Sequence, residues 1–268
     1  MKMRLFSFIK YAFLTIAALL SIFPLYWMMV AATRTNAEII RGALLPGLHL
    51  IENYKTMIGS QRVWSAMGTS FLIAIGTTAI SLFVCSIAGY AFEIYHDIHK
   101  DRLMTILLLA MMVPFAATMI PLFQMFSGMK LINNVTAVIL PAISTPFLIM
   151  MFRQGARSFP HDILEAARID GLGEFRIFIQ IYFPTAKSLF AAAMTIVFMS
   201  SWNNYLWPKI ILQSDIITMP MAVSNMIQGY STDYGAIMTA VLICTLPTVI
   251  LFSVLQRSFA DGITGAVK

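Results

Sequence analysis

The sequence predicts an all-α membrane protein with six transmembrane helices and a short cytoplasmic helix between the fourth and the fifth. Hydrophobic residues make up 59% of the 268 residues, and charged residues only 11%. Mean hydropathy is +0.80. Because soluble domains carry about 25% charged residues, a chain this poor in charge lacks a surface suited to water, and lipid must surround most of it.

Six apolar segments are long enough to cross a bilayer, since each helix needs about 20 apolar residues. The fourth is interrupted by Asn133, Asn134, Pro141 and Pro146. We keep it as a span because neighbouring helices can satisfy the backbone groups that proline frees. The first apolar run, at about 22 residues, is longer than the core of a signal peptide, so we expect it to be retained. The segments cover residues 11–32, 66–92, 103–126, 132–152, 187–211 and 236–256.

The placement of lysine and arginine predicts the orientation of these spans. With the N-terminus in the cytoplasm, the inside segments hold twelve of the 18 basic residues and the outside segments hold six. Both termini are therefore expected in the cytoplasm. This bias also accounts for the net charge of +6, so no nucleic-acid partner is needed to explain it. The six outside residues are Arg34, Arg41, Lys55, Arg62, Lys130 and Lys209.

The predicted spans carry no ionisable residue well inside them, whereas pumps and ion-coupled transporters place such residues there. An Asp pair or an intramembrane His, which a membrane protease or acyltransferase would need, is also absent from the spans. If the chain moves a solute uphill, the energy must enter from outside its own spans. The charged residues near the span ends are Glu93, Arg102, Arg153, Lys187, Lys209 and Arg257.

Cysteine and histidine usage predicts neither a disulfide nor a metal site. Cys85 and Cys244 fall within spans, where they act as small apolar residues. His96 and His99 flank Asp97 in a short cytoplasmic turn. A metal could be held there, but no metal-ligand spacing is present, and we predict none.

The largest cytoplasmic segment, residues 153–186, carries the signals of a short helix. Ser158 is a candidate N-cap, and Pro160 fits the first turn. Gly171 is placed to end the helix. The apolar residues between them form an uneven face made of Ile163, Leu164, Ala167 and Ile169.

Small residues at the centre of this helix permit two interpretations. Ala166 and Ala167 would let another surface approach closely, and Glu165 beside them offers a charge-assisted contact. In one interpretation the helix fits a groove of a partner protein. In the other it is an amphipathic connector that lies on the membrane surface. The local physics alone leaves both open.

A longer pattern surrounds this helix. Glu165-Ala166-Ala167 is followed after three residues by Gly171, and after nine more by Ile181 and then Phe183-Pro184. The chain resembles the permease subunits of ABC importers, whose signature is Glu-Ala-Ala, three residues, Gly, nine residues, Ile, one residue and Leu-Pro. Phe183 in place of leucine is the one departure, and it keeps a large apolar residue. The flank "FPHDILEAARIDG" also matches the preferred form of the family.

The resemblance extends over the whole chain, to the shorter permease of maltose-type sugar importers. It includes "FPLYWMMVAATRTNAEI" after the first span, "WNNYLWP" in the fifth and the tail "FADGITGAVK". It implies the type I ABC importer fold, in which the Glu-Ala-Ala helix is a coupling helix that docks in a cleft of a cytoplasmic ATPase. The docking residues that it implies are Glu165, Ala166, Ala167, Arg168, Asp170 and Gly171.

The resemblance also implies the partners. They are a second homologous permease, two ATPase subunits and an extracytoplasmic solute-binding protein, assembled in a bacterial plasma (inner) membrane. The sequence has no G-x-x-x-x-G-K-[ST] loop, so we expect no cofactor on this chain, with ATP and Mg²⁺ on the ATPase. It is thus expected to be a transporter subunit and not an enzyme. The predicted parts are an N-terminal helix with its outer loop (1–65), a permease core (66–257) and a cytoplasmic tail (258–268).

One cluster within the fifth span suits a sugar, because sugars stack on aromatic rings and bond to amides. Its members Trp202, Asn203, Asn204 and Tyr205 are candidates for the substrate path or a gate. The alternative is an interfacial aromatic belt with amides that link helices, and for Trp207 we favour the belt. A partner permease could also supply most of the sugar contacts.

Two rival functions stay open. Within the family, the substrate could be glycerol phosphate or a polyol instead of a neutral sugar. From another class, the chain could be an ATP-independent channel or a scaffold, although that would leave the Glu-Ala-Ala pattern unexplained. The outer loops 33–65 and 213–235 are expected to face the binding protein. Residues 261–268 could touch the ATPase, or could be a terminus without fixed structure.

Overall fold

The computed structural model describes residues 2–60, 62–213, 215–228 and 232–265, and every regular element in these ranges is helical. The all-α class is therefore confirmed. The chain forms two compact units, which we treat separately. Unit 1 comprises Met1–Ser65 and Met219–Leu246, and unit 2 comprises Ala66–Thr218 and Pro247–Lys268. Residues 219–246 thus group with the N-terminal part, whereas the sequence-based division assigned them to the core.

Unit 1 is held together by a buried amide. Asn53 is 6% exposed, and its Nδ2 donates hydrogen bonds of 2.9 Å to the carbonyl oxygens of Ala32 and Arg34. A Cβ atom on Gly235 would lie 2.6 Å from the Asn53 side chain, so any larger residue there would displace this amide. The complete helices of unit 1 are α1 (Lys2–Ala31), α2 (Asn36–Ile40), α3 (Leu50–Ser60) and α14 (Met219–Ile227).

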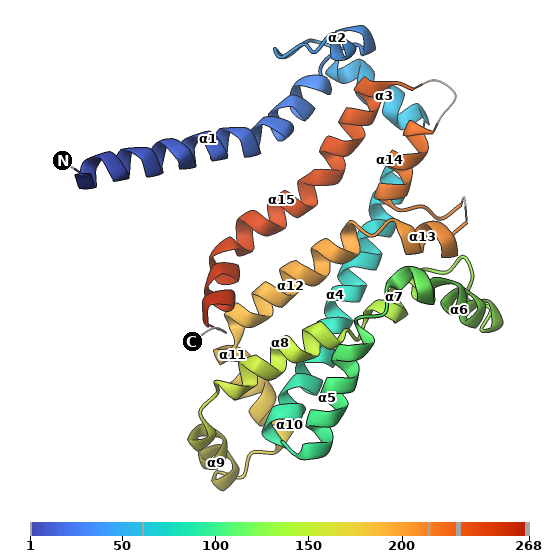
Figure 1. The fold of residues 1–268 in the computed structure, drawn as a ribbon. Helices are drawn as coiled ribbons and strands as arrows, with labels where there is room; N and C mark the ends of the chain where they lie inside the picture. The colour runs from blue at the N-terminus through green and yellow to red at the C-terminus, as the bar shows by residue number, and fades with distance from the viewer. Residues whose placement is uncertain (1, 61, 214, 229–231, 266–268) are drawn as a thin grey trace. The chain divides into compact units, whose positions relative to one another are not determined.

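Unit 2 contains most of α4 (Val63–Ile94) and the last part of α15 (Tyr234–Gly265), the two helices that the unit boundary divides. Its other helices follow one another between them (Figure 1). They are α5 (Ile98–Ala110), α6 (Phe115–Gly128), α7 (Val135–Ile139), the 3₁₀-helix η1 (Leu140–Ala142), α8 (Pro146–Arg157), α9 (His161–Ile169), α10 (Glu174–Ile177), the π-helix η2 (Phe178–Tyr182), α11 (Phe183–Thr185), α12 (Lys187–Trp202) and α13 (Leu206–Ile211).

The structure gives three helices that could each cross a membrane, and up to six spans, the predicted number, if each of three bent helix pairs is counted as one span. Ser7–Ala31, Val63–Ile94 and Tyr234–Gln256 are each long and apolar enough to cross a membrane. The bent pairs meet the same criterion only when both halves are taken together. They are Ile98–Ala110 with Phe115–Gly128 at 99°, Val135–Ala142 with Pro146–Arg157 at 45°, and Glu174–Thr185 with Lys187–Trp202 at 85°.

One predicted span ends too late and another is interrupted by a break that was not predicted, because local signals end the helices. The fifth segment was expected to continue to residue 211, but α12 ends at Trp202. Asn203 follows as its C-cap, and its Nδ2 donates 2.9 Å to the Met199 carbonyl. The third segment breaks before Pro114, since the residue ahead of a proline disfavours the helical conformation.

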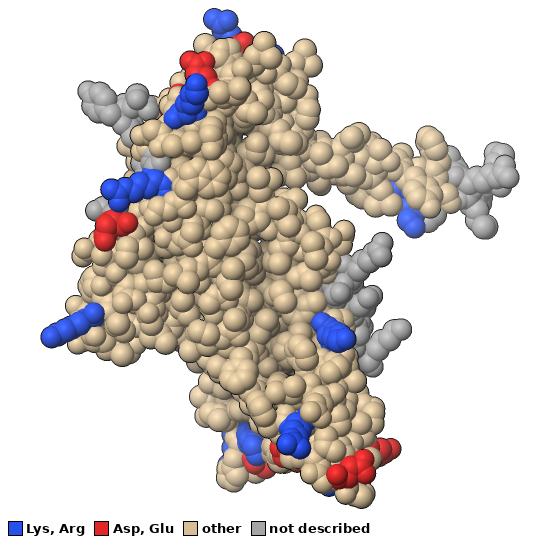
Figure 2. All heavy atoms as spheres, turned by 180° about the vertical axis from the view of Figure 1, so that it is seen from behind, with Lys and Arg blue, Asp and Glu red and all other residues tan. Residues whose placement is uncertain are grey.

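The helices of unit 2 pack closely where α4 meets α8. A Cβ atom on Gly89 would lie 2.6 Å from the Phe152 Cβ and 2.7 Å from the Arg153 backbone nitrogen. The two backbones can therefore approach because Gly89 has no side chain. Charged side chains interrupt the surface of the chain at few places, as the face drawn in Figure 2 shows. This surface suits a lipid or protein environment better than water.

Candidate functional site

The candidate site is α9, which projects at one end of unit 2 beyond α8 and α10 (Figure 1). Its N-cap is Pro160, with extended backbone at φ −63° and ψ 123°. Asp162 in the first turn places a negative charge at the positive end of the helix dipole. The predicted Ser158 cap was wrong: Ser158 lies at the end of α8, where its Oγ donates 2.9 Å to the Gly155 carbonyl.

The C-terminal end of α9 is a Schellman turn. Gly171 has φ +80°, a conformation that residues with a side chain rarely adopt. Its N–H donates 3.0 Å to the Arg168 carbonyl, and the Leu172 N–H donates 3.0 Å to the Ala167 carbonyl. The Leu172 side chain packs on the adjacent hydrophobic cluster. The sequence prediction that Gly171 ends the helix is confirmed, with Asp170 as the exposed C-cap.

One face of α9 is buried within the chain. Leu164 is 1% exposed and Ala167 is 5% exposed. They belong to a cluster that also includes Tyr90 of α4 and Tyr182 of η2. Ala167 therefore uses its small size to seat α9 on its own chain, and its methyl group does not face outward. The expected apolar face was wrong in part, because Ile163 and Ile169 lie outside this cluster and are exposed.

The opposite face of α9 is exposed. Asp162, Glu165, Ala166 and Ile169 are all exposed, and their spacing of three and four residues places them side by side. Ile169 is 86% exposed. We call these four residues the α9 outer face. Ile169 was not assigned to this face from the sequence, although its spacing from Glu165 and Ala166 could have indicated it.

Arg168 fixes the turn that follows α9. Its Nε donates 2.7 Å to Glu174 Oε1 at the start of α10. This bond and the charge of Glu174 raise the pKa of the Arg168 guanidinium. Tyr95 lies near the pair, and burial, followed by the Glu174 carboxylate, raises the pKa of its hydroxyl. Arg168 thus holds α9 to α10 and does not extend into the outer face.

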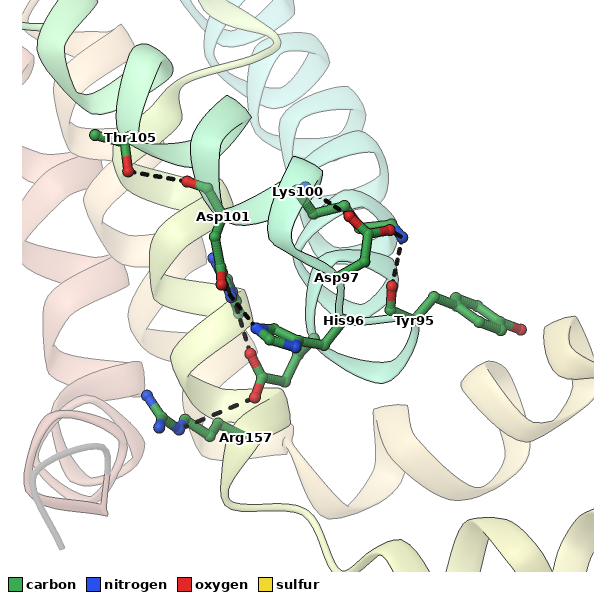
Figure 3. A network of polar contacts seen from close by, with 9 residues as sticks. Tyr95, His96, Asp97, Lys100, Asp101, Thr105 and Arg157 are labelled. Carbon is green, nitrogen blue, oxygen red and sulfur yellow. Dashed lines mark hydrogen bonds and ion pairs between the residues drawn. The ribbon is translucent and has the colours of Figure 1, made fainter.

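A second polar cluster joins the ends of α4, α5 and α8 (Figure 3). Arg153 donates 3.1 Å from Nε to Glu93 and 2.5 Å from a terminal nitrogen to Asp101. Arg153 and Glu93 are only 13% and 14% exposed. His96 Nε2 lies 2.9 Å from Asp101, and Arg157 lies 4.0 Å from Glu93. We call these five residues the Arg153 cluster.

The Arg153 cluster was missed in the sequence because its members are distant along the chain. Glu93 and Arg153 are 60 residues apart, and no local pattern links them. Next to the cluster, Asp97 caps α5 and pairs with Lys100, whose ammonium and backbone N–H hold the pKa of Asp97 at about 2. Within the described residues, no group of three or more His, Cys, Asp or Glu could hold a metal ion.

The four residues predicted for the substrate path have different surroundings in the structure, and one of them lines a cavity. Trp202 is 1% exposed, stacks on Phe198 at 5.8 Å and lies 4.8 Å from the Phe71 ring, so its place is in the core of unit 2. The amide of Asn203 caps α12. Tyr205 is partly buried where α13 begins, and Asn204 lines a cavity.

The interfacial belt expected for Trp207 was wrong. Trp207 is 3% exposed, and its Nε1 donates 2.9 Å to the carbonyl of Ala137. Its ring also packs against Phe115 and Phe126, with centroids 6.1 and 6.0 Å away. The indole therefore joins α13 to α6 and α7. A sequence shows that a tryptophan is amphipathic, but not which helix it will pack on.

The cavity that Asn204 lines has a volume of about 360 Å³ and lies within unit 2. Its polar lining consists of hydroxyl and amide groups, and no Lys, Arg, His, Asp or Glu is part of it. Helix breaks border it on two sides: Thr145 precedes α8, and Asn204 follows α12. The polar and aromatic residues of its wall are Thr77, Thr145, Phe147, Ser200, Ser201 and Asn204.

Residues 87–265 match the family of binding-protein-dependent transport system inner membrane components. The chain belongs to this family, and so is a permease subunit of an ABC transporter. In such systems the ATPase is a separate subunit, and this chain is a membrane protein and not an enzyme.

Several relatives match over nearly the full length. The chain is 43% identical over 269 residues to the lactose transport system permease protein LacG of Rhizobium radiobacter, covering 100% of this chain and 98% of that protein. It is 33% identical to the arabinooligosaccharides transport system permease protein AraQ of Bacillus subtilis, covering 96% and 94%. Its identity to the sn-glycerol-3-phosphate transport system permease protein UgpE of Escherichia coli is 29%, covering 92% of each.

The fold has a counterpart among solved structures. A bacterial ABC transporter involved in the import of the acidic polysaccharide alginate includes a chain that superposes with a TM-score of 0.84 at 20% identity. The alignment covers 96% of this chain and 97% of that chain. The type I importer architecture expected from the resemblance is thereby confirmed.

Proposed function

We propose that this chain forms half of the translocation path of an ATP-driven importer for a neutral oligosaccharide. Its partners would be a second permease, two ATPase subunits that hold ATP and Mg²⁺, and an extracytoplasmic binding protein. Family membership supports an assembly with other subunits. The full-length similarity to permeases named for lactose and arabinooligosaccharides supports the class of substrate.

The exposure of the α9 outer face is the observation that supports coupling between this chain and its ATPase. Asp162, Glu165 and Ile169 are exposed and do not pack against the cluster beneath α9. The small side chain of Ala166 between them would let a partner surface approach the helix closely. A helix that is anchored on one face and exposed on the other can receive a force from a partner and pass it to the helices beneath. Glu165 and Ala166 are the proposed contacts, while Ala167, Arg168 and Gly171 hold the helix in position and Asp170 ends it as an exposed C-cap.

The expected orientation fits this function. If both termini are cytoplasmic, as the distribution of lysine and arginine favours, α9 lies on the side of the membrane where ATP is available. The loops at 33–65 and 213–235 then face the opposite side, where a binding protein would deliver the solute. The assembly would lie in a bacterial plasma membrane.

A glycerol phosphate importer is the second candidate, because UgpE is 29% identical over nearly the whole chain. An anionic phosphate would be stabilised by a fixed positive charge in the path. The cavity lined by Asn204 has no Lys or Arg in its wall. A neutral sugar is therefore favoured over a phosphate ester, and lactose is the first substrate to test.

Uptake by the complete transporter in proteoliposomes tests the function. We expect radiolabelled lactose, delivered by the binding protein, to accumulate above its external concentration only when ATP is enclosed with the ATPase. Accumulation of sn-glycerol-3-phosphate in place of lactose would favour the second candidate. Passive equilibration without ATP would identify a channel and contradict the proposal.

A further inference from the structure

We infer that this permease subunit has its own sugar-binding site in the cavity lined by Thr77, Phe147 and Asn204. The inference rests on the proposed function and makes it more specific. The proposed function would also hold if this subunit only lined the path and the partner permease alone bound the sugar. Here the cavity belongs wholly to unit 2 of this chain.

The buried hydroxyl of Thr77 indicates that a ligand binds in the cavity. Its side chain is 2% exposed, and its Oγ1 has no hydrogen-bond partner among the described residues. A threonine in a helix can bond to the carbonyl four residues before it, as the next residue does: Thr78 Oγ1 donates 2.6 Å to Ala74. Thr77 does not make that bond, although leaving a buried hydroxyl without a hydrogen-bond partner destabilises the folded state. A ligand hydroxyl in the cavity would satisfy it.

The remaining wall suits a neutral, hydroxyl-rich ligand. Ser200, Ser201 and Asn204 at the end of α12 supply groups that both donate and accept hydrogen bonds. Thr145, the N-cap of α8, makes no side-chain capping bond, which leaves its hydroxyl available to the cavity. Each of these groups can pair with a sugar hydroxyl without a change of charge.

Phe147 completes the wall with an aromatic ring. It is 49% exposed and lines the cavity from the first turn of α8. The C–H face of a pyranose ring can stack on it, while the hydroxyls at the ring edge reach the polar groups. A volume of about 360 Å³ lies at the lower end of small-molecule sites, roughly 300–1,000 Å³, which suits one or two sugar rings. Discontinuous helices also form the substrate sites of many transporters, and two helix breaks border this cavity.

Thr77→Val and Thr78→Val form a matched pair for the test, because the two residues are adjacent and their isosteric changes remove one hydroxyl each. The measurement is the initial rate of radiolabelled lactose uptake by the complete transporter in proteoliposomes, at limiting and saturating lactose. We expect Thr77→Val to lower uptake at limiting lactose roughly threefold to tenfold, the loss of about one hydrogen bond. The thermal midpoint of the complex should be unchanged or higher, and Thr78→Val should import like the wild type.

A second variant blocks the cavity by volume. Ser201→Phe should abolish lactose uptake while ATP hydrolysis stimulated by the lactose-loaded binding protein continues, because α9 and its supports are untouched. Wild-type uptake by both Thr77→Val and Ser201→Phe would overturn the inference, and so would a loss of thermal stability in Thr77→Val that matches its loss of uptake. If the wild-type transporter itself fails to import lactose, the proposed function fails first and the inference falls with it.

Discussion

The Arg168 guanidinium donates a 2.7 Å hydrogen bond to the Glu174 carboxylate, and so joins the end of α9 to the start of α10. Between the two residues the chain makes the left-handed turn at Gly171. The ion pair, the turn and the buried Leu164 and Ala167 together hold α9 as a rigid extension of unit 2. A force applied to the outer face would therefore reach the helices beneath and not be lost in a flexible loop.

Removing this ion pair should affect coupling more than stability. Arg168 and Glu174 are 40% and 41% exposed, so we expect Arg168→Met to change the free energy of unfolding by less than about 1 kcal/mol. Lactose imported per ATP hydrolysed should nevertheless fall, because α9 can then move relative to α10. The exposed Arg176 on α10 offers a control with the same charge change. Equal stoichiometry in Arg168→Met and Arg176→Met would show that the pair has no role in coupling.

Gly171 should tolerate no side chain, whereas Gly173 should. With φ +80° at Gly171, Gly171→Ala forces an L-residue into the left-handed region at a cost of about 1–2 kcal/mol and disrupts the turn that ends α9. Gly173 has φ −72° and no atom within 4 Å of a Cβ, so Gly173→Ala is the matched control. Proteolytic cleavage near α9 and lactose uptake measure the effect. Similar behaviour of the two variants would contradict the assigned turn.

Arg153 should be essential for stability at the ends of α4, α5 and α8. Arg153→Met leaves the partly buried Glu93, whose side chain is 14% exposed, without its main partner, and we expect a loss of about 2 kcal/mol of unfolding free energy, less than for a fully buried pair. Arg157 is 72% exposed and lies 4.0 Å from Glu93, so Arg157→Met should have little effect. Thermal denaturation of the solubilised complex compares them. A midpoint for Arg153→Met as high as that of Arg157→Met would refute the role of the cluster.

Gly89 should be required for the contact between α4 and α8. The Cβ atom of Gly89→Ala would lie 2.7 Å from the backbone nitrogen of Arg153, and a helix backbone cannot yield as a flexible side chain can. We expect reduced yield of assembled transporter and a lower thermal midpoint. Gly68, on the same helix, has no atom within 4 Å of a Cβ position, and Gly68→Ala should assemble normally.

The sequence was sufficient for features that local rules govern. Apolar length predicted the three long spanning helices and the regions of the three bent helix pairs. Pro160 and Gly171 lie at the two ends of α9 because each favours a particular backbone conformation at its own position. The Arg153 cluster could not be predicted, since charges near three separate span ends meet only after the helices pack. The burial of Ala167, Trp202 and Trp207 also depends on tertiary packing. From the sequence, all three could equally have faced a partner, a substrate or lipid.

Glu165, an exposed charged residue of the α9 outer face, is the contact on which coupling to the ATPase is proposed to depend most. Affinity purification of the tagged chain, with quantification of the ATPase subunits that copurify, tests it. Glu165→Lys should reduce copurifying ATPase roughly tenfold or more, as expected for reversing a charge in an interface, and should abolish ATP-driven uptake. Glu52→Lys, the same change at an exposed position of α3, should retain the ATPase. Wild-type amounts of ATPase and wild-type uptake with Glu165→Lys would contradict the central claim that α9 couples this permease to its ATPase.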